Sequence, residues 1–272
     1  MSAMTEAPGS WQPIEVHRVR DGQRSMVADR AATEAPLEMR LHGQSFVLTM
    51  RTPGADRDLA AGFLMAEGVV GAPDEIASMA QADDHSAIDI TVRGEALQRL
   101  DARLTARRHV AATSACGICG RQTADALEVT AAPCTASWTM PSQDVTALPD
   151  RLRARQDVFA RTGGLHAAGL FTRDGTLLEI AEDVGRHNAV DKIVGRMLMR
   201  GALPLAECAL CVSGRASYEL VQKAIVAGIP MLVAVSAPST MAIDLATRHG
   251  LTLVGFARGD GFNIYSHAQR VA

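Results

Sequence analysis

Met231-Leu232-Val233-Ala234-Val235 is the stretch that decides the fold, because all five of its residues are apolar. An apolar run without polar alternation is typical of a strand in a sheet that is buried on both faces. Segments with helical spacing flank it at residues 218–227 and 240–248. Further outward, strands and helices keep alternating, at residues 150–161 (helix), 167–171 and 177–181 (strands), 187–200 (helix), 208–212 and 251–257 (strands). Repeated strand–helix units predict a three-layer α/β domain over residues 150–272.

The chain before residue 111 follows a different pattern. Runs with strand-like alternation occur at residues 14–19, 37–41, 46–50 and 88–92, and segments with helical spacing at 59–67 and 95–107. We therefore expect a small α+β domain over residues 13–110, preceded by a disordered tail at residues 1–12. Residues 111–149 are predicted to form a cysteine loop and a connector rich in Ser, Thr and Pro.

Composition narrows the classes of function. The 272 residues are 47% hydrophobic and only 4% aromatic, with a formal net charge of -3. A sequence pI of about 6.2 argues against broad electrostatic binding of nucleic acid. No apolar run is long enough to cross a bilayer, and residues 1–12 show no signal peptide, so we expect a cytoplasmic protein with no membrane partner. Thiols stay reduced there, so the five cysteines are expected to be catalytic, metal-binding or buried.

The loop Cys116-Gly117-Ile118-Cys119-Gly120 carries the clearest chemical signal. Two cysteines at this spacing could share a metal, form a strained disulfide or take part in sulfur transfer. A zinc site needs two more ligands, and Cys208 and Cys211 have a suitable spacing. Residues three apart on a strand point to opposite faces, so we expect these two to be buried as small hydrophobes. Cys134 has no assigned role, and sulfur or redox chemistry is favoured over structural zinc at Cys116 and Cys119.

Three loops follow predicted strands at corresponding positions: residues 213–215, 236–240 and 255–261. The carboxyl ends of strands in an α/β sheet face a shared crevice where ligands bind. Arginines and helix starts suit phosphate, Phe256 could stack on a base, and Asp260 could accept from a guanine edge. Turn formation and helix capping explain any one loop equally well. Three loops together favour a nucleotide-like ligand.

Polar residues also gather around residues 162–192. His166, Asp183, His187 and Asp191 could form a polar pocket, although a His near a helix start is more often a cap or a packed residue. A zinc deaminase needs a Glu two residues after such a His, and Ala189 stands there instead. The layout is thus compatible with a deaminase-like fold without the deaminase chemistry.

Together these segments resemble the formate dehydrogenase accessory sulfurtransferase family, FdhD. The matching stretches run in order from about Ile14 to the C-terminus. They are Ala61-Gly62-Phe63-Leu64 through Glu67-Gly68, Cys116-Gly117-Ile118-Cys119-Gly120, Thr162-Gly163-Gly164-Leu165-His166, residues 182–192, Ser213-Gly214-Arg215 and Gly255-Phe256-Ala257-Arg258.

The resemblance implies a sulfurtransferase and its partners. A cysteine desulfurase would load sulfur as a persulfide on Cys116, with Cys119 as the second motif cysteine. The sulfur would pass to the molybdenum bis-guanine-dinucleotide cofactor, bound as a substrate, before that cofactor enters formate dehydrogenase. A homodimer and a cytidine-deaminase-like C-terminal domain without a permanent metal are implied as well. The expected cofactor-binding residues are Phe256, Ala257, Arg258, Gly259, Asp260 and Gly261, joined by Ser213, Gly214, Arg215 and Ser236 of the strand-end loops.

A binding module is the alternative to a sulfur-transfer enzyme. In that hypothesis the chain is a non-catalytic chaperone for the cofactor or the dehydrogenase, and Cys116 and Cys119 hold a structural zinc. Two cysteines cannot complete a tetrahedral site, but a dimer would supply four.

Overall fold

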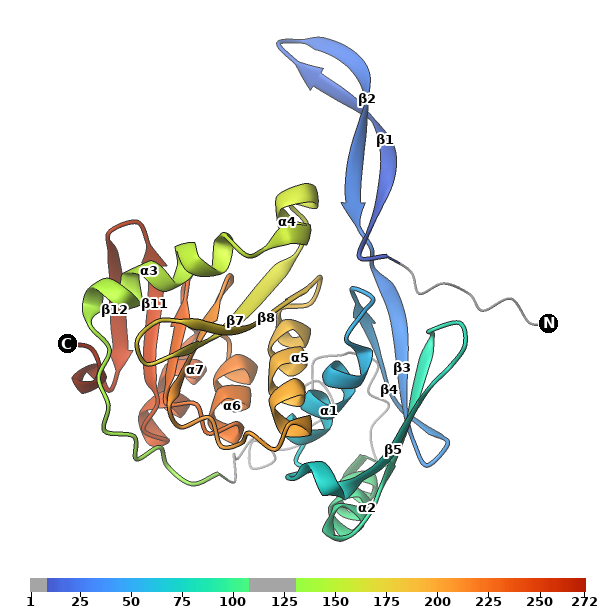
Figure 1. Cartoon of the computed structure of the whole chain (residues 1–272), viewed down its shortest axis with the longest axis vertical. Helices are drawn as coiled ribbons and strands as arrows, with labels where there is room; N and C mark the ends of the chain where they lie inside the picture. Colours follow the sequence, from blue (N-terminus) through green and yellow to red (C-terminus); the bar gives the residue numbers. More distant parts are fainter. Residues whose placement is uncertain (1–8, 108–130) are drawn as a thin grey trace.

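A six-stranded mixed sheet forms the larger part of the protein in a computed structural model that describes residues 9–107 and 131–272 (Figure 1). The strand order is β12-β11-β10-β9-β7-β8. Strands β9, β10 and β11 are parallel, whereas β7, β8 and β12 run antiparallel to their neighbours. The bounds are β7 His166–Thr172, β8 Leu177–Asp183, β9 Cys208–Val212, β10 Met231–Ala234, β11 Thr252–Arg258 and β12 Gly261–Ser266.

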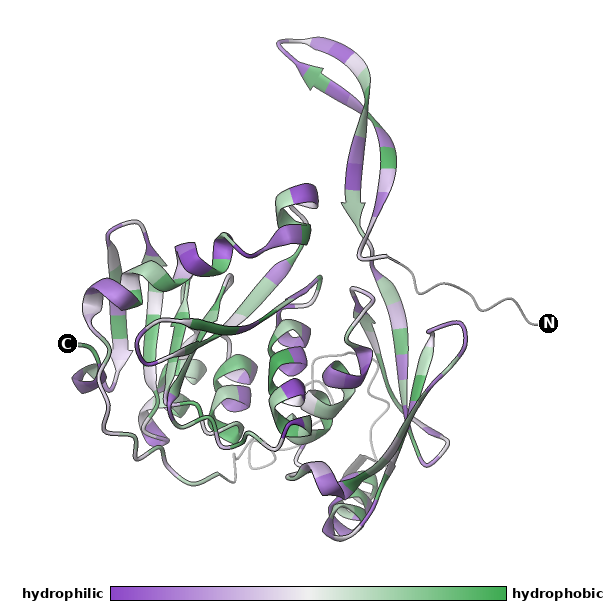
Figure 2. Cartoon of the chain, viewed as in Figure 1, coloured by the Kyte–Doolittle hydropathy of each residue, from purple (hydrophilic) through white to green (hydrophobic). Residues whose placement is uncertain are grey.

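Helices cover both faces of this sheet, which confirms the predicted three layers. Helices α5 (Arg186–Met199), α6 (Tyr218–Val226) and α7 (Thr240–Arg248) pack on one face, and α3 (Ser142–Arg153) on the other. Along β9, Leu210 and Val212 belong to the core on the α5–α7 side, whereas Ala209 and Cys211 belong to the core under α3. Because both sets are buried, the central strands β9 and β10 are apolar throughout, and Figure 2 shows hydrophobic colouring in the middle of the sheet.

The N-terminal part is a four-stranded sheet with two helices, as the α+β pattern predicted. Its strand order is β4-β3-β6-β5, and α1 is the helix that meets the larger part. The bounds are β3 Ala35–Leu41, β4 Gln44–Arg51, α1 Asp56–Ala66, β5 Ile76–Gln81, β6 Ala87–Val92 and α2 Glu95–Arg107, with a short 3-10 turn η1 at Pro73–Glu75.

Helices α1 and α5 cross in close contact and join the two parts. A Cβ atom on Gly62 would lie 2.0 Å from the carbonyl oxygen of Asp191, and one on Gly195 would lie 1.9 Å from that of Asp58. Only glycine permits this approach. One continuous hydrophobic core therefore runs from Leu37 in β3 to Leu253 in β11.

A two-stranded hairpin projects from the body (Figure 1). It consists of β1 (Trp11–Arg20) and β2 (Gln23–Ala32), joined by Asp21 and Gly22, which both have positive φ. At its base, Arg30 and Arg161 lie over the ring of Trp11. Strand β1 starts at Trp11, so the expected disordered tail is wrong for its last two residues.

The connection into the larger sheet also differs from the prediction. Helix α3 begins at Ser142, inside the expected connector, because Val145, Leu148 and Leu152 repeat at helical spacing and are all buried. The single helix expected at residues 150–161 is instead the end of α3 followed by the short helix α4 (Asp157–Thr162). Strands β2, β5 and β12 were not predicted.

Candidate functional site

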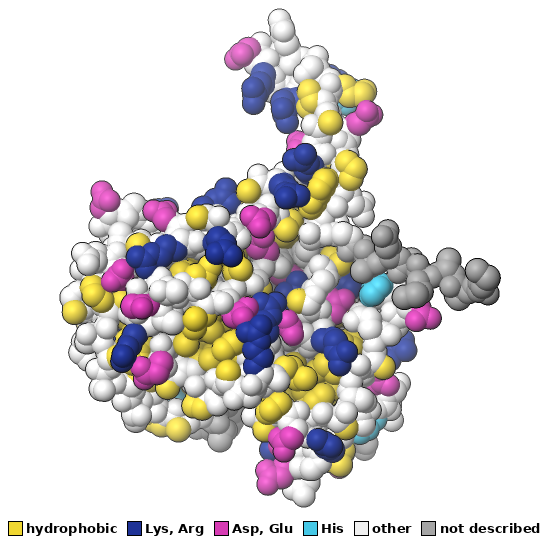
Figure 3. All heavy atoms as spheres, viewed as in Figure 1, with side chains coloured by type: hydrophobic (Ala, Val, Ile, Leu, Met, Phe, Trp, Pro, Cys, Tyr) yellow, Lys and Arg dark blue, Asp and Glu magenta, His cyan; other side chains and the backbone are white. Residues whose placement is uncertain are grey.

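The loops after β9, β10 and β11 meet at one edge of the sheet because these strands are parallel. A cleft of about 500 Å³ opens there. The strand ends contribute Ser213, Val235, Ala257, Arg258 and Gly259. The opposite wall consists of the segment from the end of α3 to the start of β7: Pro149, Asp150, Leu152, Arg153, Gln156, Phe159, Gly163, Gly164, Leu165 and His166. Arginine and lysine side chains are visible over the α3–α4 region in Figure 3.

Backbone hydrogen bonds hold the three strand-end loops together. The Ser236 N–H donates to the Gly214 carbonyl (3.2 Å), and the Phe256 N–H donates to the Ser236 carbonyl (3.2 Å). The Ser213 hydroxyl accepts from the Ala167 N–H at 2.9 Å. Strand β11 has an irregular register between Gly255 and Arg258, and Phe256 has a φ of 54°. Such irregularities locally disrupt the strand ladder, and this one lies at the cleft residues Ala257 and Arg258.

The structure brings together part of the predicted cofactor-binding set. Ser213, Ala257, Arg258 and Gly259 line the cleft. Gly214 and Ser236 lie next to it through the hydrogen bonds described above, and the Arg258 guanidinium lies 5.9 Å from the ring centre of Phe256. Three expected residues, Arg215, Asp260 and Gly261, are exposed and do not line it. Asp260 belongs to the turn between β11 and β12, and the acidic residue that lines the cleft is Asp150.

The predicted catalytic residues Cys116 and Cys119 lie outside the described residues. The prediction for the other paired cysteines is confirmed. Cys208 is buried in the core toward α5–α7 and Cys211 in the core under α3, so they point to opposite faces of β9. Burial raises the pKa of both thiols, which keeps them protonated and unreactive. Cys134 is partly exposed, and its sulfur accepts from Arg270 at 3.6 Å.

His166 lines the cleft at the start of β7. Burial lowers the pKa of its imidazole, nearby Arg186 and His187 lower it further, and Asp183 acts in the opposite direction. A neutral ring is therefore favoured at pH 7, and it can donate or accept a hydrogen bond. His187 is near His166, and its Nε2 atom lies 3.2 Å from the Ser217 hydroxyl and 3.4 Å from a Glu219 carboxylate oxygen.

The aspartates of the predicted polar pocket are structural instead. Asp183 is fully buried and accepts from the backbone N–H groups of Thr52 (3.1 Å) and Gly185 (2.8 Å), from the Asn188 amide (2.9 Å) and from Lys192 Nζ (2.7 Å). Asp191 is buried 2.5 Å from Lys223 Nζ, and burial raises its pKa. The hypothesis that His166, His187 and both aspartates share one pocket is therefore wrong for Asp183 and Asp191.

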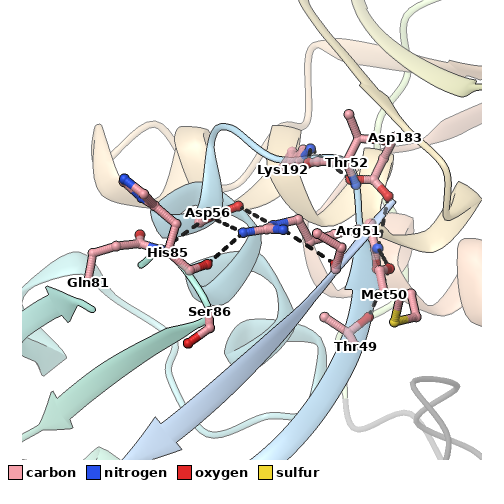
Figure 4. Close-up of polar contacts among 12 residues, drawn as sticks. Thr49, Met50, Arg51, Thr52, Asp56, Gln81, His85, Ser86, Asp183 and Lys192 are labelled. Carbon is pink, nitrogen blue, oxygen red and sulfur yellow. Dashed lines mark hydrogen bonds and ion pairs between the residues drawn. The ribbon is translucent and has the colours of Figure 1, made fainter. Parts of the chain in front are cut away.

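Figure 4 shows that this buried region extends into the N-terminal part. Lys192 Nζ also donates to the Thr52 carbonyl at 2.9 Å. Next to Thr52, Arg51 forms a two-pronged ion pair with Asp56 (2.8 and 2.9 Å) and donates to the His85 carbonyl. We call the residues Arg51, Thr52, Asp56, Asp183, Asn188 and Lys192 the junction. The pairing of these residues could not be predicted from local patterns, because the partners are up to 140 residues apart.

The α3–α4 side of the cleft was also missed. Arg153 and Phe159 contact each other, with the guanidinium 4.0 Å from the ring centre. Gln156 is 4% exposed and lines the cleft, and its Nε2 atom has no hydrogen-bond partner in the described part of the chain. A local pattern could have located α3, but not the break after it that exposes these side chains to the cleft.

Two tests for other site classes are negative within the described residues. In residues 9–107 and 131–272, no group of three or more His, Cys, Asp or Glu side chains is placed to hold a metal ion. Over the same ranges, no helix has the length and apolar character that a bilayer crossing requires.

Comparison with known proteins identifies the family. The family model described as FdhD/NarQ matches residues 32–272, so the match begins at the end of the hairpin. The chain is 50% identical to the sulfur carrier protein FdhD of Streptomyces avermitilis, over 95% of this chain and 94% of that protein. It is 41% identical to the sulfur carrier protein FdhD of Sulfolobus acidocaldarius, over 95% of this chain and 97% of that one.

A solved structure shows the same fold. The crystal structure of a proposed formate dehydrogenase accessory protein from Desulfotalea psychrophila aligns with a TM-score of 0.76 and 24% identity, over 96% of this chain and 99% of that one. The fold, the matching family model and the curated relatives agree with the motifs. This chain belongs to the FdhD/NarQ family.

Proposed function

We propose that the protein carries sulfur as a persulfide on Cys116, from a cysteine desulfurase to the molybdenum bis-guanine-dinucleotide cofactor that formate dehydrogenase requires. The relatives named as sulfur carrier proteins support the first half of this proposal. The observation that supports the second half is the cleft, which combines Arg258, the neutral His166 and glycine backbone at the ends of parallel strands. Such sites suit phosphate-bearing ligands.

The size of the cleft limits what it holds. A volume of about 500 Å³ lies within the range of sites for a single drug-sized molecule, roughly 300–1,000 Å³. One guanosine diphosphate end of the cofactor matches that size, whereas the whole bis-dinucleotide does not. The metal-bearing part of the cofactor would then extend out of the cleft.

The loading step needs only a thiolate at position 116. The Cys116 thiolate attacks the outer sulfur of the desulfurase persulfide and forms a new S–S bond. The donor S–S bond breaks, and the donor cysteine leaves as a thiolate, so no external oxidant or reductant is consumed. In the sequence, a glycine follows each motif cysteine and adds no side chain beside it.

Mass spectrometry after incubation with a cysteine desulfurase and cysteine tests this function. We expect the mass of one added sulfur atom on the peptide that contains Cys116. The adduct should disappear in Cys116→Ala and persist in the control Cys134→Ala, because Cys134 contacts Arg270 away from the cleft. A Cys116→Ala protein that still matures active formate dehydrogenase would eliminate the proposal. Stoichiometric zinc, together with unfolding on chelation, would favour the chaperone hypothesis.

Three expectations from the family resemblance stay predictions. They are the homodimer, the client formate dehydrogenase and the likeness of the larger domain to cytidine deaminases. Sedimentation of the purified protein tests the first of these, and maturation of the dehydrogenase in a strain that lacks this protein tests the second.

A further inference from the structure

Gln156 is the polar side chain in the cleft that the fold does not explain. It lies between α3 and α4, its N–H donates to the Arg153 carbonyl (3.3 Å), and its carbonyl accepts from the Ala160 N–H (2.9 Å). The backbone is thus held on both sides, while the side-chain Nε2 is buried without a hydrogen-bond partner among the described residues. Burying a polar group without a partner costs about 1–3 kcal/mol. A residue that costs stability in the free protein is expected to gain a partner when a ligand binds.

Position separates Gln156 from the other unpartnered atoms. Thr33 Oγ1, Arg186 Nε and His249 Nδ1 are also buried without partners in the described part of the chain. None of these three residues lines the cleft, whereas Gln156 does. The unsatisfied amide therefore coincides with the site that the strand-end loops form.

The chemistry of a carboxamide defines its complement. An amide presents a donor and an acceptor side by side in one plane, so it pairs with a ligand edge that presents an acceptor beside a donor. The lactam edge of guanine has this arrangement, with O6 as the acceptor and N1–H as the donor. The exocyclic amine of guanine is a second donor, and Asp150 on the same wall supplies an acceptor-only carboxylate. Adenine has no amine at that position for a carboxylate to bind.

We propose that Gln156 and Asp150 select a guanine base, with Gln156 on the lactam edge and Asp150 on the exocyclic amine. This inference rests on the proposed function, because it assigns the base of the nucleotide end that the cleft is proposed to hold. A pterin ring has the same lactam and amine edge as guanine. Arg258 and Arg153, which line the same cleft, favour the nucleoside diphosphate, because its phosphates match two cations.

Calorimetric titration of the full chain with GDP, IDP, ADP and 6-carboxypterin tests the assignment. For the unaltered protein we expect GDP to bind at least about tenfold more tightly than ADP, since a good two-pronged base contact contributes about 1–3 kcal/mol of discrimination. IDP lacks the exocyclic amine and should bind more weakly than GDP. Tighter binding of 6-carboxypterin than of GDP would overturn the guanine assignment.

Two variants separate the two roles. Gln156→Leu should weaken GDP binding by about tenfold and leave ADP binding nearly unchanged. Asp150→Asn should remove the preference for GDP over IDP. The matched control is Gln143→Leu, an exposed glutamine earlier in α3 that does not line the cleft, and it should bind all nucleotides as the unaltered protein does. A Gln156→Leu protein that keeps its preference for GDP over ADP would overturn the inference.

Stability measurements distinguish a ligand contact from a structural role. Gln156→Leu removes a buried unsatisfied donor, so the ligand-free variant should unfold at an equal or higher denaturant concentration. If Gln156 only stabilised the fold, the same variant would unfold earlier. Lack of GDP binding by the unaltered protein would overturn both this inference and the cofactor site. Persulfide formation on Cys116 is measured separately. If the persulfide forms but the preference for guanine is absent, the inference about base recognition fails and the proposed sulfur transfer does not.

Discussion

The junction and the cleft are both rich in buried or half-buried polar side chains, but they differ in how those side chains are partnered. In the junction, Asp183 accepts from four donors and Arg51 donates to a carboxylate and to backbone carbonyls. In the cleft, Gln156 Nε2 has no partner among the described residues, and the contact found there for Arg258 is the ring of Phe256. The two regions adjoin, since Asp183 of the junction is the register partner of His166 of the cleft where β8 pairs with β7.

Under the proposed function, this difference separates polar residues that stabilise the fold from those that bind a ligand. A buried charge is tolerated only when its partners are present in the folded chain itself. The junction meets that condition, so its residues fix the N-terminal part against α5. In the cleft, Arg258 is exposed, and the uncharged Gln156 amide is the buried group without a partner among the described residues, so in our proposal a ligand completes its hydrogen bonding. Variants in the junction should therefore change stability, and variants in the cleft should change binding.

Lys192→Met should have the largest effect of the variants considered. It leaves Asp183 buried without its cation, and breaking a buried pair in this way costs about 3–5 kcal/mol. Urea denaturation followed by circular dichroism measures the loss. The matched control is Arg173→Met, because Arg173 pairs with Glu207 on the surface, where both side chains are more than half exposed. The control should change stability by less than about 1 kcal/mol. Equal losses in both variants would contradict the distinction between the regions.

Arg258→Gln should have a smaller effect than Lys192→Met, and it should change ligand affinity instead of stability. It removes a cation from the cleft without breaking any ion pair found among the described residues, so unfolding should be nearly unchanged. A charged hydrogen bond contributes about 1.5–3 kcal/mol, so GDP affinity should fall by roughly tenfold or more. Calorimetric titration measures the affinity, and Arg248→Gln, an exposed arginine at the end of α7, is the control. A loss of stability as large as that of Lys192→Met would place Arg258 with the junction.

The same two regions show how far the sequence predicted the structure. Local patterns sufficed for elements whose signals lie within a few residues. The helix expected at residues 240–248 is α7 with the same bounds, and its cap is local, since the Ser239 hydroxyl accepts from the Ala242 N–H. The loops at residues 213–215 and 236–240 were placed correctly because the order of parallel strands and helices determines where such loops lie. The third loop, expected at residues 255–261, is mostly wrong, since residues 255–258 belong to β11 and Gly261 starts β12.

Features that depend on distant partners were missed. Helix α4 is separate from α3, and its first N–H groups, on Val158 and Phe159, donate to the carboxylate of Glu182 in β8. No local pattern shows that contact, so the sequence pattern predicts one helix over residues 150–161. Asp183 is bound by Thr52, 131 residues earlier, so its neighbours in the sequence could not reveal that it is structural. The hairpin was missed for another reason: the Asp21-Gly22 turn signal was present but overlooked.

His166 lies between the two regions and should show the smallest effect. It lines the cleft, and burial lowers its pKa, as do Arg186 and His187, while the junction residue Asp183 acts in the opposite direction. Because its pKa is lowered on folding from the usual value of about 6.5, the unfolded chain binds more protons at mildly acidic pH. Stability should therefore fall as the pH drops from about 7.5 to 5.5, through the unfolded-state pKa.

His166→Gln isolates that contribution, because every other titrating group, including His187, stays in place. Urea midpoints at the two pH values should differ less in the variant than in the unaltered protein. At the higher pH, where the ring is neutral in both states, the variant should lose little stability if His166 serves the cleft. A large loss of stability at the higher pH, together with an unchanged pH dependence, would contradict this prediction. It would show that His166 stabilises the fold as the junction residues do.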